Sequence, residues 1–163
     1  MQRWIKRWIK LIFMVYLVVL IKLIIFKHPY EQLVKIAVSW KSQVIYEGLT
    51  RANFIPFRTI KMYIVYADRL NSFENLVGNI LAFVPFGMMF PFIDTRISSF
   101  RYVLINALVL VLGIELFQLF SAFGAFDVDD IILNCFGVIL GYVIYAKRQI
   151  LFPALASQHE SLT

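Results

Sequence analysis

The sequence predicts an all-α membrane protein, a small bundle of about four transmembrane helices forming a single domain over residues 1–163. Two observations predict this class. The chain is 61% hydrophobic and 16% charged, with a mean hydropathy of +0.76, whereas soluble domains are about 45–50% apolar and about 25% charged. The apolar residues also form four blocks, and a backbone that crosses lipid satisfies its hydrogen bonds within a helix.

The four predicted spans cover about residues 9–26, 75–93, 102–123 and 128–146. Each block is close to the roughly 20 residues that a helix needs to cross the hydrocarbon core. Basic residues precede the first block, but no small-residue cleavage pattern follows it, so we expect an uncleaved span instead of a signal peptide. The Lys and Arg residues of the short connections favour a multi-pass topology with both termini in the cytoplasm.

The long connection between the first and second spans begins with an amphipathic pattern. Its apolar side is formed by Leu33, Ile36, Ala37, Trp40 and Val44. Such a helix suits the membrane interface, and it suits equally a position packed over the mouth of the bundle. Further on, Pro56 in "NFIPFRTI" opposes a regular helix.

Charge and side-chain chemistry exclude several classes of function. The formal net charge is +6, but the basic residues lie between apolar blocks and face head groups, so no nucleic-acid partner is expected. The single Cys135 cannot form an intrachain disulfide. Neither His28 nor His159 has a second imidazole or thiol at helical spacing, so we expect no metal site and no cofactor.

Polar side chains recur within or beside the apolar blocks, where they are costly and usually face the interior of a bundle. This functional polar set consists of Asn75, Asn79, Glu115, Gln118, Asp127, Asp130 and Asn134. Spacings of three and four place the members of each span on one helix face. On the favoured topology these faces meet near the outer surface, which predicts a polar pocket open to the outer leaflet.

Several of these residues have simpler explanations. Asp127 at the start of its span is a good helix N-cap, and Asn75 at the edge of another span could be a second cap. Glu115 lies well inside its span, where it is either a functional acid or a structural hydrogen-bonding partner. Asp129 falls off the polar stripe, and we expect it to be solvated.

Four further residues are expected to shape the helices. Pro85 and Gly87 in "FVPFG" predict a kink or break at mid-depth of the second span. Gly137 and Gly141 form a G-x-x-x-G pattern, which is usually a device for packing one helix closely against another.

The order of these motifs resembles the VanZ-like family of bacterial membrane proteins. The matching segments are "NFIPF", "NLVGNILAFVPFG", "IELFQLF" and "DVDDIILNCFGVILG", over about residues 53–145. Each motif is weak alone, but their order and spacing are fairly specific. Many relatives have an Arg shortly before the first Asp of the last motif, where this chain has "SAFGAFD", so no mechanism that needs that Arg is carried over.

The resemblance implies a protein of the bacterial cell membrane with a role in low-level resistance to the glycopeptide teicoplanin. We favour a non-enzymatic protein that reduces access of a lipoglycopeptide at the outer surface. One alternative is an enzyme acting on a lipid-linked envelope precursor with Glu115 and Asp130 as acid and base, although no activated nucleophile is evident. Another is a small proton-coupled transporter or flippase. Expected partners are membrane lipids and one of these ligands, and a homo-oligomer stays open.

Overall fold

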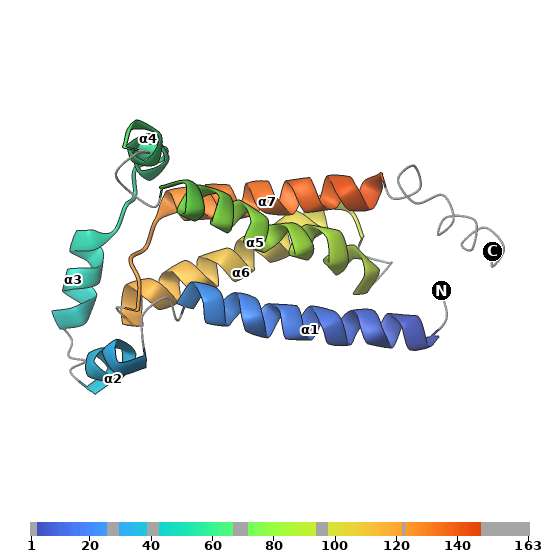
Figure 1. Ribbon diagram of the computed structural model, residues 1–163, viewed down its shortest axis with the longest axis horizontal. Helices are drawn as coiled ribbons and strands as arrows, with labels where there is room; N and C mark the ends of the chain where they lie inside the picture. The colour runs from blue at the N-terminus through green and yellow to red at the C-terminus, as the bar shows by residue number, and fades with distance from the viewer. Residues whose placement is uncertain are drawn as a thin grey trace.

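The computed structural model describes residues 3–25, 30–38, 43–66, 72–93, 98–121 and 123–147, and helices dominate this part of the chain (Figure 1). The helices within these ranges are α1 (Arg3–Ile25), α2 (Tyr30–Val38), α3 (Gln43–Arg51), α4 (Arg58–Val65), α5 (Ser72–Ile93), α6 (Phe100–Ser121) and α7 (Val128–Ala146). The all-helical class predicted from the sequence is therefore confirmed for the described residues.

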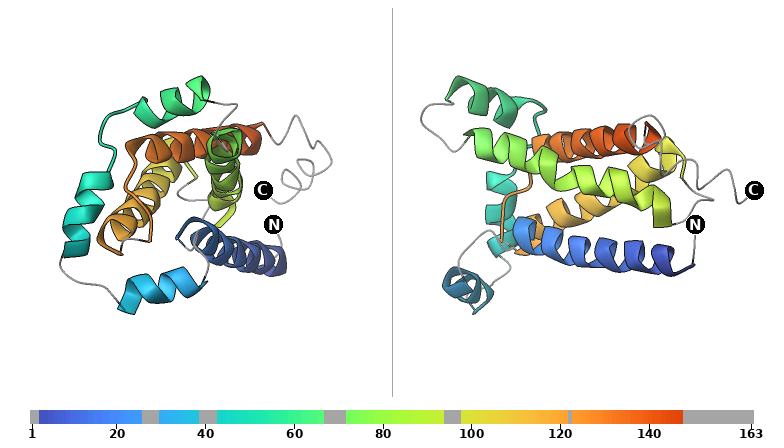
Figure 2. Two further views of the ribbon diagram at one scale, coloured as in Figure 1. Left: turned by 60° about the vertical axis from the view of Figure 1, so that its left-hand side comes forward. Right: turned by 45° about the vertical axis from the view of Figure 1, so that its right-hand side comes forward.

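The four long helices α1, α5, α6 and α7 lie side by side along the longest axis of the molecule (Figure 1). The short helices α2, α3 and α4 curve around one end of this bundle, as both views of Figure 2 show. That end is where α1 and α6 finish and where α5 and α7 begin. The start of α1 and the end of α7 lie together at the opposite end.

Three of the long helices are long and apolar enough to cross a membrane. They are α5, α6 and α7, with hydropathies of 1.9, 2.3 and 1.6 in their most apolar stretches. Helix α7 begins and ends at the predicted residues 128–146, whereas α5 begins three residues before the predicted 75 and α6 runs two residues ahead of the predicted 102–123. Helix α1 has 23 residues, and Phe26 at the end of its predicted span lies outside the described residues.

The core of the bundle is apolar and is formed by all four long helices. Helix α6 contributes a stripe at spacings of four, four and three: Val103, Ala107, Val111 and Ile114. This stripe meets Phe83 and Phe86 of α5 and Phe13 of α1. Many other apolar side chains of the long helices are exposed, among them Leu81, Val109 and Val18, as expected of surfaces that face lipid. Because lipid is as apolar as these side chains, close packing supplies much of the attraction between helices.

Glycines permit the closest contact in the bundle, that between α5 and α7. A Cβ atom at Gly137 would overlap the carbonyl oxygen of Ile80, and one at Gly141 would overlap that of Val84. From the opposite helix, Gly87 lies equally close to the backbone of α7. The backbones approach within van der Waals contact only because these positions carry no side chain.

Of the predicted kink or break at Pro85, the break is wrong, because α5 continues as one helix through Pro85 and Pro91 to Ile93. The kink stays a prediction. Neighbouring helices can support a proline-containing segment by bonding nearby carbonyl groups. Here the Tyr16 hydroxyl of α1 donates to the Ala82 carbonyl at 2.7 Å, one residue from the carbonyl that Pro85 leaves without its helical donor.

The amphipathic pattern of residues 33–44 falls on two short helices, α2 and α3. Trp40, which the pattern placed on the apolar side, lies outside the described residues. Helix α3 contacts the end of α6, where Gly48 lies against the backbone of Leu119. Gly48 lies beyond the amphipathic pattern, so the two positions considered for that pattern, at the membrane interface and over the mouth of the bundle, both stay predictions.

Candidate functional site

The site begins with a backbone pairing between two segments far apart in the sequence. The Asn53 N–H donates to the Phe126 carbonyl at 2.8 Å, and the Val128 N–H donates to the Asn53 carbonyl at 3.0 Å. Together they form an isolated parallel bridge between Asn53 and Asp127. The segment before α4 is thereby aligned with the start of α7, although more than 70 residues separate the two segments in the sequence.

The Asp127 carboxylate is both the N-cap of α7 and a bridge to this segment. One oxygen, Oδ1, accepts from the Asp129 N–H at 2.8 Å, which is the capping bond. The same oxygen accepts from the Asn53 amide at 2.8 Å, and Oδ2 accepts from the Thr59 hydroxyl at 2.6 Å. Capping therefore explains only part of what Asp127 does.

The prediction that Asp129 is solvated is wrong, because its side chain is fully buried. Its carboxylate accepts hydrogen bonds from the backbone N–H groups of Phe57, Thr59 and Ile60, the last two at 2.7 and 3.1 Å. These are the unpaired donors at the start of α4, where a negative charge is favourable. Asp129 lies off the polar stripe of α7, and its side chain therefore points toward α4 and not toward water.

Phe57 turns the chain into α4 in an unusual backbone conformation. Its φ of 66° and ψ of 3° lie in the left-handed region, which costs a non-glycine residue roughly 1–2 kcal/mol. Helix α4 has no buried residue of its own. The two aspartates of α7 therefore supply much of what holds this turn and helix in place.

Glu115 and Gln118 are buried supports of the same end of the bundle. Glu115 is 1% exposed, and its Oε2 atom accepts from the Asp127 N–H at 2.9 Å. Gln118 is 3% exposed, and its amide donates to the Ile24 carbonyl at 3.1 Å. Gln118 thus satisfies a carbonyl at the end of α1, where helical donors run out.

An open pocket of about 380 Å³ lies between α4 and the start of α7. Its lining residues are Thr50, Arg51, Ala52, Asn53, Arg58, Thr59, Met62, Tyr63, Ala125, Phe126, Asp127 and Asp130. Asp130 accepts from the Asn79 amide of α5 at 2.6 Å, which fixes its position in the wall. Burial raises the pKa of the Tyr63 hydroxyl above its ordinary value of 10.0, and the charges of Asp130 and Asp127 raise that pKa further.

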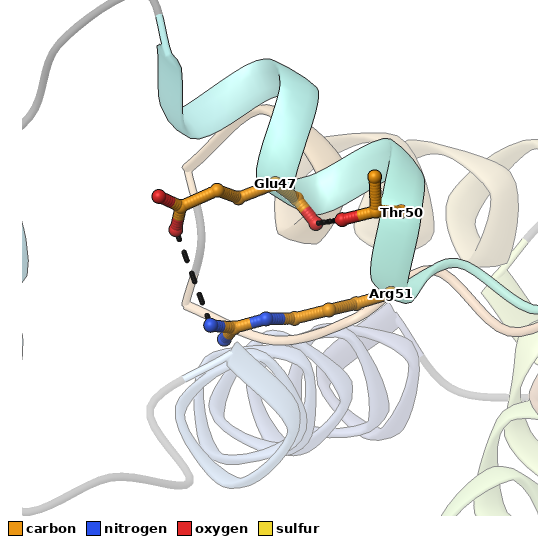
Figure 3. A network of polar contacts seen from close by, with 3 residues as sticks. All are labelled: Glu47, Thr50 and Arg51. Atoms are coloured by element: carbon orange, nitrogen blue, oxygen red, sulfur yellow. Dashed lines mark hydrogen bonds and ion pairs between the residues drawn. The ribbon is translucent and has the colours of Figure 1, made fainter.

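The basic side chains of this pocket differ in their surroundings. Arg51 is exposed and extends along α3, where its guanidinium lies 3.9 Å from the Glu47 carboxylate (Figure 3). The Thr50 hydroxyl is turned back to the Glu47 carbonyl at 2.8 Å. Arg58 is exposed at the first turn of α4. The pocket therefore combines carboxylates on α7 with a guanidinium group on α4.

The structure divides the predicted polar set into separate environments. Asp127 and Asp130 line the pocket and Asn79 supports it, while Glu115 and Gln118 are buried behind it. Asn134 is 2% exposed, and its Oδ1 atom has no hydrogen-bond partner among the residues that the structure describes.

Asn75 is exposed on α5, and because that helix already begins at Ser72, the suggestion that Asn75 caps it is wrong.

Sequence reasoning did not identify Asn53, Thr59 and Tyr63 as residues of the site. It named Asp129 but expected its side chain to face water. The sequence does contain a pattern that could have indicated Asn53, Thr59 and Asp129. The segment "NFIPFRTI" interrupts helical structure with Pro56 and so needs acceptors for its free N–H groups. Asp129, a carboxylate directed off the polar stripe, is such an acceptor. Tyr63 had no comparable signal, because α4 is short and mostly exposed.

The polar side chains of this site can recognise charged and hydrogen-bonding groups. Within the described ranges, no group of three or more His, Cys, Asp or Glu side chains could hold a metal ion. The pocket wall offers acceptors from Asp130, a hydroxyl from Tyr63 and a cation from Arg58.

Comparisons with known proteins give two matches. The model of the VanZ/LLP1 family matches residues 13–152. Protein VanZ of Enterococcus faecium is 29% identical over 130 residues, which cover 80% of this chain and 68% of that protein. No solved structure matches the chain.

Proposed function

The chain belongs to the VanZ/LLP1 family, and from this premise we propose that it contributes to envelope-level resistance to teicoplanin-type lipoglycopeptides in the bacterial membrane. The observation that carries the proposal is the similarity to Protein VanZ over 80% of the chain. That region includes most of the long helices and hence the scaffold of the pocket. The role is non-enzymatic: the protein reduces access of the drug to its target at the outer surface.

The proposal includes a topology in which α1 joins α5, α6 and α7 as a fourth span. Its support is the arrangement of the termini, because α1 begins and α7 ends at one end of the bundle (Figure 1). Arg3, Lys6, Arg7 and Lys10 lie at that end in α1, and Arg101 and Lys147 join them from α6 and α7. Basic residues in short connections favour the cytoplasm, and on this ground we propose that the pocket faces the outside.

The pocket is the proposed point of contact with the drug. Its wall is charged, while Phe54, Ile55 and Phe57 beside it are 56%, 60% and 62% exposed. A ligand with polar groups and an acyl tail, as a lipoglycopeptide has, suits a charged wall next to exposed apolar side chains. We place the drug's polar groups against Asp130 and Arg58 and its tail along these apolar residues.

The test is teicoplanin susceptibility and the amount of labelled drug bound to cells, measured in a susceptible strain with and without the protein. Wild-type expression should raise the inhibitory concentration and lower surface binding. Asp130→Asn, which keeps the side-chain volume, should remove most of this effect, and Arg101→Gln at the opposite end should retain it. Unchanged susceptibility with wild-type protein at normal membrane levels would refute the proposal.

An extracted-lipid profile from the same strains separates this proposal from an enzyme. A non-enzymatic protein leaves the pool of lipid-linked envelope precursors unchanged in composition. A new or missing precursor that depends on Asp130 would instead favour the enzymatic alternative.

A further inference from the structure

The pocket between α4 and α7 lies at the level where membrane head groups are expected. It is bounded by the first turn of α7 and by α4, at the end of the bundle where α5 and α7 begin (Figure 1). Helices α5 and α7 are candidate membrane spans, so their ends lie near the boundary between hydrocarbon and head groups. The pocket therefore opens where lipid is the most abundant ligand.

Two charged side chains of opposite sign line the pocket from different helices. Asp130 belongs to α7 and Arg58 to α4, and both line the cavity. Asp127 accepts three hydrogen bonds on its two oxygens, and one of them caps α7. Arg51 is drawn along α3 toward Glu47 (Figure 3). Asp130 and Arg58 together suit a ligand that itself carries one positive and one negative group.

The surroundings of Tyr63 support a cation near Asp130. The charges of Asp130 and Asp127 raise the pKa of its hydroxyl, in addition to the effect of burial. Asp130 and Asp127 therefore both act on the wall of the pocket that carries Tyr63. A primary amine brought to this wall gains both the Coulomb attraction and charge-assisted hydrogen bonds.

We propose that the pocket binds a lipid head group in which a primary amine lies next to a phosphate. The ammonium group donates to Asp130, and the phosphate lies against the Arg58 guanidinium. The acyl chains lie along the exposed side chains of Phe54, Ile55 and Phe57. This inference rests on the site of the proposed function and names a ligand class for it, an endogenous lipid that a drug would have to displace.

The test is binding of short-chain lipids to the purified full-length protein in a neutral detergent, measured by calorimetry. Dihexanoyl-phosphatidylethanolamine carries both charges, whereas dihexanoyl-phosphatidylglycerol lacks the amine. We expect the first lipid to bind about tenfold more tightly, since one charge-assisted hydrogen bond is of that order. Soluble phosphoethanolamine, which carries an amine and a phosphate but no acyl chains, should bind more weakly than the lipid.

The variants separate the two charges. Asp130→Asn should weaken binding of the ethanolamine lipid about tenfold and leave the glycerol lipid unaffected. Arg58→Gln should weaken both lipids alike, and because Arg58 is exposed, this variant remains informative if Asp130→Asn fails to fold. Arg101→Gln should leave both affinities unchanged.

Three results would overturn the inference. The first is equal binding of the two lipids, and the second is an Asp130→Asn variant that weakens both equally. The third is soluble phosphoethanolamine binding as tightly as the lipid, which would point to a free phosphoamine as the ligand. The inference and the proposed function can fail separately. Selective lipid binding without resistance refutes only the function, and resistance without selective lipid binding refutes only this inference.

Discussion

The buried carboxylate of Asp129 provides the sharpest test of how this end of the molecule is held together. The substitution Asp129→Asn keeps the volume of the side chain but removes its charge and one acceptor. In the native protein the two oxygens accept from three backbone N–H groups, those of Phe57, Thr59 and Ile60. An asparagine offers one acceptor oxygen, and its amide group then faces a backbone donor. The start of α4 should open while the long helices stay packed.

The magnitude follows from the number of bonds. At least one buried N–H group loses its partner, which costs about 1–3 kcal/mol. The remaining hydrogen bonds become weaker because their acceptor is no longer charged, which costs roughly another 1 kcal/mol. Helix α4 has no buried residue that could offset the loss. A total of about 3 kcal/mol raises the population of the open segment roughly 100-fold.

Hydrogen–deuterium exchange measured by mass spectrometry on the purified protein tests this expectation. Peptides that cover residues 53–66 should exchange roughly 100-fold faster in Asp129→Asn than in the wild type, and peptides from the body of α7 should be unchanged. The matched control is Glu47→Gln, an exposed acid of α3 in a 3.9 Å ion pair, which should change neither. Unchanged exchange in residues 53–66, or equal acceleration in α7, would refute the reasoning.

Three further predictions concern packing, backbone strain and titration. Gly137→Ala should destabilise the bundle by about 1–3 kcal/mol in denaturant titration, because a Cβ there meets the backbone of α5; Gly113→Ala, with open space around it, should not. Phe57→Val should accelerate exchange in residues 53–66, because a β-branched residue is strained at a φ of 66°; equal exchange would contradict this. Since the pKa of Tyr63 is raised on folding, its contribution to stability should be complete below pH 10 and decline above it. In spectrophotometric titration Asp130→Asn should lower that pKa, and an unchanged value would show that the carboxylate does not act on the hydroxyl.

Much of the architecture could be predicted from the sequence because the bilayer restricts the choices. Apolar blocks near 20 residues long predict membrane-spanning helices, because only a helix satisfies the backbone hydrogen bonds of a single segment in lipid. Helix α7 begins and ends where its apolar block does. The glycine spacing of Gly137 and Gly141 likewise indicates a close helix contact before any partner is known. The break considered at Pro85 does not occur, because the prolines do not end α5, which packs closely on α7 and receives the Tyr16 hydroxyl bond at Ala82.

The candidate site shows where sequence alone stops. Helical spacing tells which side chains share a face, and on that ground Asp127, Asp130 and Asn134 belong together. It cannot tell which segment from elsewhere in the chain will meet that face. Asp127 and Asp129 bind the segment at residues 53–60. The backbone N–H groups at the start of α4 have no helical acceptor, and Asp129 of a distant segment supplies one. That pairing depends on the fold of the intervening chain, so only the tertiary structure decided which acids hold α4 in place and which line the pocket.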